Sequence, residues 1–223
     1  MGIPCFVSGT RVETPTGPRL IEDLKAGDDV VSGSTGAARA ILWAGQRRVS
    51  PSAMRRNPSL QPVLLPRHVL GNHSDLLLSR SHAVALGLPG DARLFRAGQL
   101  LHAVPGVRPV ASETSVTYHH LYLASHDLIV ANGLLCETFL PGPRAIATLG
   151  SRSRKRLLDV LEQGPHLPIL PYAQGNHVRA LKRMLAQTKR PSQNQTVKIA
   201  SAVAISTLAA AIRMPTPNID ANR

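Results

Sequence analysis

Several side chains in this sequence could carry nucleophilic chemistry, and the thiol of Cys5 is the first of them. A thiol becomes a strong nucleophile once a base or a positive environment generates the thiolate. The other cysteine, Cys136, lies in a predicted strand and is expected to pack in the core. Because a buried free cysteine is often inert, the thiol of Cys5 taken alone is compatible with either a nucleophile or a packing residue.

Ser79 and His82 form a second candidate group, three residues apart between two apolar runs. On one turn of the chain, a hydroxyl and an imidazole at this spacing can converge on a single backbone amide. The hydroxyl then holds the amide, while the imidazole protonates the nitrogen as the bond breaks. A Ser-x-x-His pattern also arises by chance, so the two residues alone predict little.

Three histidines, His119, His120 and His126, precede an Asn132-Gly133 pair. Such a cluster could suggest zinc, but no acidic or cysteine ligand stands at a familiar spacing. His119 and His120 are also neighbours in a predicted strand, so their side chains should point to opposite faces. The sequence therefore predicts neither a metal site nor a cofactor.

The elements that must position these residues are short strands joined by turns. Glycine and proline are frequent, at 17 and 18 residues, and two cysteines exclude a disulfide scaffold or a four-cysteine zinc module. Strands are expected at 10–14, 30–31, 40–44, 76–78, 83–86, 116–123, 127–130 and 134–139. The Asn-Gly pair between the last two is a strong hairpin signal. An all-β fold is therefore expected, with an irregular segment at 51–75 and mixed strand and helix signals at 93–104.

Positive charge is concentrated in the last third of the chain. Residues 151–223 carry 12 Lys and Arg against 3 Asp and Glu, whereas residues 1–150 carry 14 against 10. The hydrophobic period also changes after residue 143 and predicts short helices at 152–163, 178–187 and, weakly, 199–212. We expect residues 144–223 to form a basic extension, partly helical or disordered. At most, it should attract phosphate or anionic lipid weakly and without specificity.

Composition and targeting signals exclude several other classes of protein. Few aromatic residues and no recognisable motif argue against specific nucleic-acid binding. No apolar run follows basic residues at the amino terminus, so no signal peptide is predicted. The longest run that lacks Asp, Glu, Lys, Arg and His has 14 residues, fewer than the roughly 20 needed to cross a bilayer. A cytoplasmic, monomeric protein is the expectation.

Five short motifs stand in a characteristic order along residues 5–141. They are Cys5-Phe6-x-x-Gly9-Thr10, Gly27-Asp28, Ser79-x-x-His82, Tyr118-x-His120 and Ala131-Asn132-Gly133. In this order they resemble the Hint domain, the self-cleaving module of hedgehog proteins and inteins, in its bacterial intein-like form of alphaproteobacterial type. The resemblance implies an all-β Hint fold over residues 1–143, a horseshoe-like, pseudo-twofold array of short strands, followed by the basic extension.

The resemblance also implies a reaction, an N-to-S acyl shift. In it, the Cys5 thiolate attacks the carbonyl of Pro4, and a thioester replaces the peptide bond. By resemblance, Ser79 and His82 polarise that peptide and protonate the Cys5 nitrogen, while His120 acts as base or orienter. The substrate is then the chain's own upstream polypeptide, released when water or another nucleophile resolves the thioester.

The closing strand departs from the intein pattern. Inteins end in His-Asn ahead of Cys, Ser or Thr, and the asparagine cyclises to complete splicing. The equivalent region here is Leu135-Cys136-Glu137-Thr138, so cleavage without splicing is expected. The alternative is a degenerate Hint scaffold that no longer cleaves and serves as an interaction module, and the residues leave this alternative open.

Overall fold

A computed structural model describes residues 3–88 and 91–188 of the chain. It shows a protein built mainly from short strands. The strands are β1 (Phe6–Val7), β2 (Arg11–Val12), β3 (Arg19–Leu20), β4 (Asp29–Val31), β5 (Ala38–Ala40), β6 (Trp43–Val49), β7 (Val63–Leu65), β8 (Leu76–Leu78), β9 (Ala83–Leu88), β10 (Asp91–Arg96), β11 (Arg108–Pro109), β12 (Val116–Tyr122), β13 (Leu128–Ala131) and β14 (Leu134–Glu137). The helices are α1 (Pro51–Arg56), α2 (Ala97–Leu100), α3 (Pro143–Ala147), α4 (Ser151–Leu158) and α5 (Gly175–Thr188), with 3-10 turns at Ile21–Asp23 and Pro58–Leu60. The predicted all-β class is confirmed.

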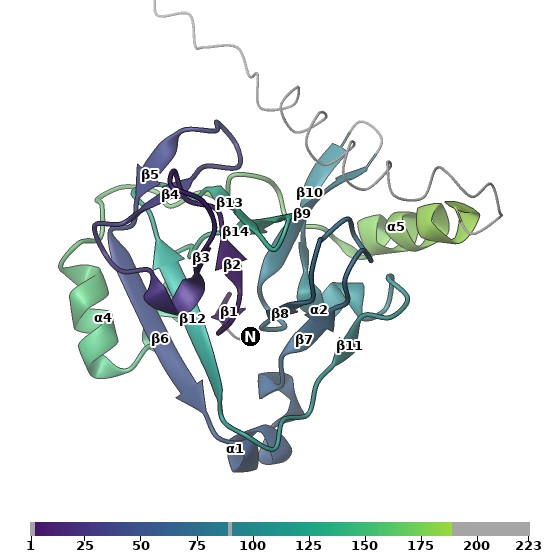
Figure 1. The fold of residues 1–223 in the computed structure, drawn as a ribbon, viewed down its shortest axis with the longest axis horizontal. Coiled ribbons are helices and arrows are strands. Elements are labelled where there is room, and N and C mark those ends of the chain that lie inside the picture. The colour runs from purple at the N-terminus through teal and green to yellow at the C-terminus, as the bar shows by residue number, and fades with distance from the viewer. Residues whose placement is uncertain (1–2, 89–90, 189–223) are drawn as a thin grey trace, which may run out of the picture.

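Two six-stranded sheets contain most of these strands. Their orders are β11-β7-β8-β1-β12-β6 and β10-β9-β14-β13-β2-β3, and β4 and β5 form a separate pair. The long strands β6 and β12 run antiparallel beside each other along one flank of the molecule (Figure 1). Strand β1 lies between β8 and β12, so the described chain starts in the middle of the molecule rather than at its edge (Figure 1).

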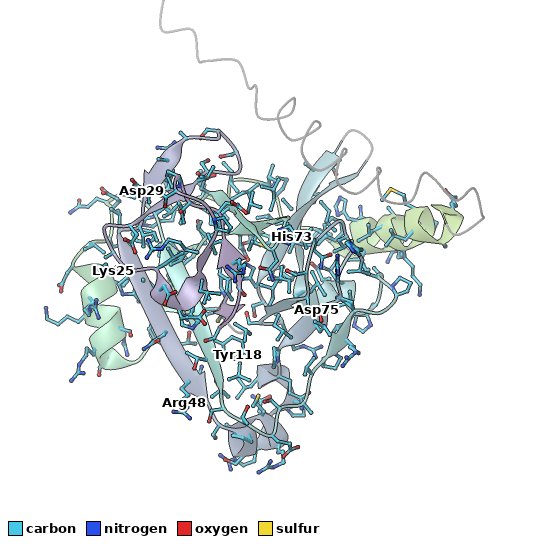
Figure 2. All side chains as sticks on the ribbon, in the orientation of Figure 1. Lys25, Asp29, Arg48, His73, Asp75 and Tyr118 are labelled. Atoms are coloured by element: carbon cyan, nitrogen blue, oxygen red, sulfur yellow. The ribbon has the colours of Figure 1, made fainter. Side chains whose placement is uncertain are left out.

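The predicted hairpin joins β13 to β14 through Asn132 and Gly133. Both residues have a positive φ, of 49° and 89°, as a type I′ turn requires. The Asn132 side chain also ties the turn to two distant segments. It accepts a hydrogen bond from the Arg11 backbone N–H at 2.8 Å and donates one to the carbonyl of Asp75 at 2.6 Å. Asp75, labelled in Figure 2, lies in the loop just before β8.

Two segments differ from the sequence expectation. Residues 51–60, expected to be irregular, form α1 and a 3-10 turn. Helix α1 begins there because the Ser50 hydroxyl accepts a hydrogen bond from the Ala53 N–H at 3.2 Å and Pro51 occupies the first turn. The mixed signals at 93–104 arise because β10 passes directly into α2.

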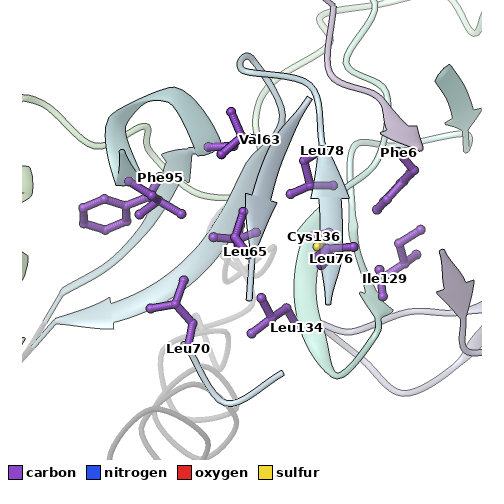
Figure 3. Packing of buried hydrophobic residues seen from close by; sticks show 14 of the residues in the cluster. Phe6, Val63, Leu65, Leu70, Leu76, Leu78, Phe95, Ile129, Leu134 and Cys136 are labelled. Carbon is purple, nitrogen blue, oxygen red and sulfur yellow. The ribbon is translucent and has the colours of Figure 1, made fainter. Parts of the chain in front are cut away.

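The largest cluster of buried apolar side chains joins the two sheets. Phe6 and Leu78 reach it from the first sheet, and Ile129 and Cys136 from the second (Figure 3). Cys136 is fully buried, with 0% of its surface exposed. The packing role expected for Cys136 is therefore confirmed.

The described residues beyond residue 143, which are residues 144–188, pack against the strands. Helix α4 lies beside β6 (Figure 1), and its Leu157 is fully buried in a second cluster with Trp43, Tyr122 and Phe139. Leu181 of α5 joins the largest cluster. A domain boundary at residue 143 stays a prediction, but the part described up to residue 188 contributes side chains to the same cores.

The remaining expectations for this end of the chain concern its helices. Helices α4 and α5 fall within or near the segments predicted to be helical, whereas the predicted helix at 199–212 lies outside the described residues. None of the described helices combines the length and the apolar character needed to span a bilayer.

Replacement of Leu157 by alanine should destabilise the protein. Leu157 is 0% exposed whereas its neighbour Leu158 is 50% exposed, which makes Leu158→Ala a matched control. We expect Leu157→Ala to lower the free energy of unfolding by about 2–5 kcal/mol, because it leaves a cavity. Leu158→Ala should change it by less than about 0.5 kcal/mol. Denaturant unfolding measures both, and equal midpoints for the two variants would contradict the packing of α4.

Candidate functional site

Cys5 is held at the junction of β1 and β8. Phe6 pairs with Leu78 across these strands, so Cys5 and Ser79 meet although 74 residues separate them. The backbone N–H of Ser79 donates to the Cys5 carbonyl at 3.0 Å, and the Cys5 N–H donates to the Ser79 hydroxyl at 3.0 Å. Cys5 itself is buried, with 7% of its surface exposed. These two hydrogen bonds therefore fix the position of the Pro4–Cys5 peptide relative to Ser79.

The hydroxyl of Ser79 spans the Pro4–Cys5 peptide. Besides accepting the Cys5 N–H, it donates to the carbonyl oxygen of Ile3 at 2.8 Å. The Cys5 thiol donates to the same Ile3 oxygen at 3.1 Å. These bonds hold the Pro4–Cys5 peptide at its own nitrogen and at the carbonyl of the residue before Pro4. The contribution of the Ile3 carbonyl is one that the sequence did not indicate.

His120, on β12, contacts both the carbonyl of this peptide and the Cys5 thiol. Its Nδ1 lies 2.8 Å from the Pro4 carbonyl oxygen, and its Nε2 lies 3.8 Å from the Cys5 sulfur. A carbonyl oxygen only accepts hydrogen bonds, so Nδ1 carries the ring hydrogen. In the neutral ring, Nε2 then has a free lone pair next to the thiol. One imidazole can thus donate to the oxygen under attack and accept the proton of the attacking group.

Aromatic neighbours fix the orientation of the His120 ring. The ring of Trp43 stacks on it at 6.1 Å and an interplanar angle of 16°, and Phe139 meets it edge-on at 5.7 Å. All three side chains are at most 2% exposed. This packing leaves the ring little freedom to rotate away from Pro4 and Cys5.

His82 lies on the same turn as Ser79, as the spacing predicted. Its backbone N–H donates to the Ser79 carbonyl at 3.0 Å. The ring is 1% exposed and meets Phe6, the residue after Cys5, edge-on at 4.2 Å. Within the described part of the chain, neither ring nitrogen has a hydrogen-bond partner. The structure therefore brings His82 beside the Cys5 segment but not into a hydrogen bond with the amide.

Burial determines the protonation state of the site at rest. It raises the pKa of the Cys5 thiol to about 12, although the Ser79 hydroxyl and the Arg47 guanidinium act against this rise. It lowers the pKa of both His82 and His120 to about 4. Near neutral pH, the site thus holds a protonated thiol and two uncharged imidazoles, and the thiol needs a base in order to attack.

The other histidines of the sequence cluster point elsewhere. His119 faces away from His120, as expected for strand neighbours, and its Nε2 lies 2.8 Å from the Ser8 hydroxyl. His126 lies 3.4 Å from the carboxylate of Glu137. In residues 3–88 and 91–188, no group of three or more His, Cys, Asp or Glu side chains is arranged to hold a metal ion.

A cavity of about 390 Å³ opens beside the Pro4–Cys5 peptide. Cys5, Ser79 and His120 line it together with the cationic side chains of Arg47 and Arg80. The cavity gives water or a small nucleophile room to reach a carbonyl carbon bound to the Cys5 sulfur.

Sequence reasoning missed Glu137, which belongs to this neighbourhood. Its side chain is buried on β14, and its two oxygens accept hydrogen bonds from the Ala83 N–H at 2.8 Å and the Tyr172 hydroxyl at 2.6 Å. The available signal was an acidic residue inside an otherwise apolar strand.

The chain is similar to several proteins of solved structure and matches one family model. Among solved structures, the chain is similar to the bacterial intein-like domain from Clostridium thermocellum, at 18% identity, covering 61% of this chain and 97% of that chain, with a TM-score of 0.45. It is also similar to the MchDnaB-1 intein, at 14% identity, covering 60% of this chain and 98% of that chain, with a TM-score of 0.41. None of the curated proteins compared with the chain matches it.

A family model described as the Hint domain matches residues 4–143, and these residues include Cys5, the Ser79–His82 turn, His120 and the closing hairpin. Since that match covers well over half of the sequence, this chain belongs to the Hint domain family.

Proposed function

We propose that this Hint domain processes itself at the peptide bond between Pro4 and Cys5 through an N-to-S acyl shift. The observation that carries the proposal is the position of one imidazole. His120 contacts the carbonyl oxygen of Pro4 and the thiol of Cys5, while Ser79 bonds to the nitrogen of the same peptide. The substrate is the chain's own upstream polypeptide, which ends at Pro4.

The first step forms the carbon–sulfur bond. Nε2 of His120 takes the thiol proton as the Cys5 sulfur bonds to the carbonyl carbon of Pro4, and the carbonyl electrons move onto oxygen. Nδ1–H of the same ring donates to this oxyanion from 2.8 Å. The negative charge on the Pro4 oxygen and the positive charge on the His120 ring form next to each other, so the two opposite charges are only one hydrogen bond apart.

The second step breaks the carbon–nitrogen bond. The Cys5 nitrogen must gain a proton as it leaves, because an amide anion is a poor leaving group. We assign this step to the Ser79–His82 turn, since the Ser79 hydroxyl already bonds to that nitrogen and the buried His82 ring lies on the same turn. Because the His82 ring is uncharged at rest, it can donate only after it has received the proton that His120 took from sulfur. The net change then moves one proton from sulfur to nitrogen and leaves a thioester and a free amine, with no cofactor.

The third step releases the upstream segment. Water or an added thiol enters the cavity and attacks the thioester carbon, which frees the Cys5 thiol again. The reaction is a single turnover, because the enzyme and the substrate are one chain.

Replacement of Cys5 should abolish release. A reporter domain is fused ahead of Met1, and dithiothreitol or hydroxylamine is added to trap the thioester. The reporter should leave with a cut between Pro4 and Cys5, as mass spectrometry of both products will show. Cys5→Ala should release nothing, because no other thiol lies at this peptide, whereas Cys136→Ala should still cleave. If the unsubstituted fusion never cleaves, the degenerate-scaffold alternative replaces this proposal.

Replacement of His120 should slow release by about two to four orders of magnitude, the usual range for the loss of a positioned base. His119→Ala is the matched control, because this neighbouring histidine points away from the peptide. The pKa of His120 lies near 4 because of burial, so the neutral, proton-accepting ring persists down to about pH 5. The rate should therefore stay level between about pH 6 and 8 and fall toward pH 4.

The rate is measured with enough nucleophile that release no longer depends on its concentration, so that the acyl shift is limiting. If His120→Ala released the reporter as fast as the unsubstituted protein, His120 would not be the base of the first step. A fall that is already complete at pH 6 would show a base with an ordinary histidine pKa.

Splicing should not accompany this cleavage. The closing strand ends in Glu137 and Thr138 rather than His-Asn, so no asparagine can cyclise there. The side-chain amide of Asn132 is already engaged by Arg11 and Asp75. A reporter placed after Arg223 should therefore remain attached to Cys5 and all that follows it. Mass spectrometry that found a free downstream reporter, or two flanking segments joined together, would contradict this prediction.

A further inference from the structure

Glu137 is a buried carboxylate whose charge no cation neutralises among the described residues. Its side chain is 1% exposed, and both oxygens accept hydrogen bonds, from the Ala83 N–H and the Tyr172 hydroxyl. A buried charge is costly unless it is paired and hydrogen-bonded. Such a group calls for an explanation beyond packing.

The nearest ionisable partner of Glu137 does not cancel its charge. His126 Nε2 lies 3.4 Å from the Glu137 carboxylate. However, Nδ1 of His126 accepts a hydrogen bond from the Ile169 N–H at 2.9 Å, so that nitrogen carries no hydrogen. The His126 ring is therefore neutral, and the negative charge of Glu137 remains available to other groups nearby.

His82 is the group on which this charge acts most usefully. Glu137 holds the N–H of Ala83, the residue directly after His82, and β14 pairs with β9 at this point. Burial dominates in lowering the pKa of His82, and the charge of Glu137 is the largest influence in the opposite direction. The other groups that face His82 are His120 and His126, which lower its pKa only when they are themselves protonated, and the backbone of Cys5, which raises it.

A segment beyond the matched family region holds Glu137 in place. We call residues 169–173 the strap. Its Tyr172 hydroxyl donates to Glu137, and its backbone joins β10 through hydrogen bonds between Leu94 and both Pro171 and Ala173, at 3.0 and 2.9 Å. The guanidinium of Arg96 covers the Tyr172 ring at 4.2 Å. A second cavity, also of about 390 Å³, is lined by residues that include both Glu137 and Pro4.

We infer that Glu137 is a positioning residue for the proposed cleavage, which supports His82 as proton donor to the Cys5 nitrogen, and that the strap keeps Glu137 in this position. The inference rests on the proposed function. As the carbon–nitrogen bond breaks, His82 must carry a proton although its ring is buried. A fixed negative charge beside its turn stabilises that protonated ring, whereas a neutral side chain does not.

The test uses the full chain with a reporter ahead of Met1. Glu137→Gln keeps the size of the side chain and an acceptor for the Ala83 N–H but removes the charge. It should slow release by roughly 10- to 100-fold, which is less than the loss expected when a general acid is removed altogether. Glu113→Gln is the matched control, since that glutamate side chain is 92% exposed, and it should cleave at the unsubstituted rate.

A double-mutant cycle separates positioning from a structural role. If Glu137 acts through His82, then Glu137→Gln should cost nothing further in a His82→Ala background, whereas a structural defect would add its full cost there. Tyr172→Phe, which keeps the carboxylate, should slow release by a smaller factor that also vanishes in the His82→Ala background. This variant provides the test if Glu137→Gln does not fold, as judged by its unfolding midpoint.

The outcomes separate this inference from the function on which it rests. If the unsubstituted fusion cleaves but Glu137→Gln cleaves equally fast, or if its cost persists undiminished without His82, the inference is overturned and the acyl shift stands. If the unsubstituted fusion does not cleave, the proposed function fails first.

Discussion

The position of β1 between β8 and β12 is the constraint on which the candidate site depends. A strand of two residues makes few hydrogen bonds of its own, so its register is determined by burial of Phe6 and by pairing on both sides. That register places Cys5 beside Ser79 at the end of β8 and beside His120 on β12. A shift by one residue would turn the thiol to the opposite face and separate it from both partners.

Burial of this peptide makes the resting site uncharged and keeps its reactive groups in contact. Inside a low-dielectric environment, a thiolate or an imidazolium is costly, so protons should move only over short distances between groups already in contact. In the proposed reaction, the two contacts of His120 would meet this requirement, because Nε2 would take the proton from sulfur while Nδ1–H of the same ring donates to the developing oxyanion. The burial that suppresses the thiolate would then restrict this reaction to the one peptide that His120 contacts.

The described residues beyond the matched family region, 144–188, share apolar and polar contacts with it. Leu157 and Leu181 complete apolar clusters that the strands begin. Tyr172 reaches back to Glu137, and Ile169 fixes the tautomer of His126. The polar contacts of Glu137 and His126 therefore join the strands to the strap, which sequence composition had assigned to the extension.

The sequence by itself determined the features that depend on neighbouring residues. The Asn132-Gly133 turn, the short strands and the turn that carries Ser79 and His82 all follow from backbone preferences over a few positions. The order of the motifs was enough for the family and for Cys5 as the candidate nucleophile. The tertiary structure alone decided which atoms meet. The contacts of His120 with Pro4 and Cys5, which lie more than 110 residues away in the chain, and the burial of Glu137 against Tyr172 depend on strand register and on packing between distant segments. A hydrophobic period predicts that a residue is buried, but it carries no information about which distant partner shares its site.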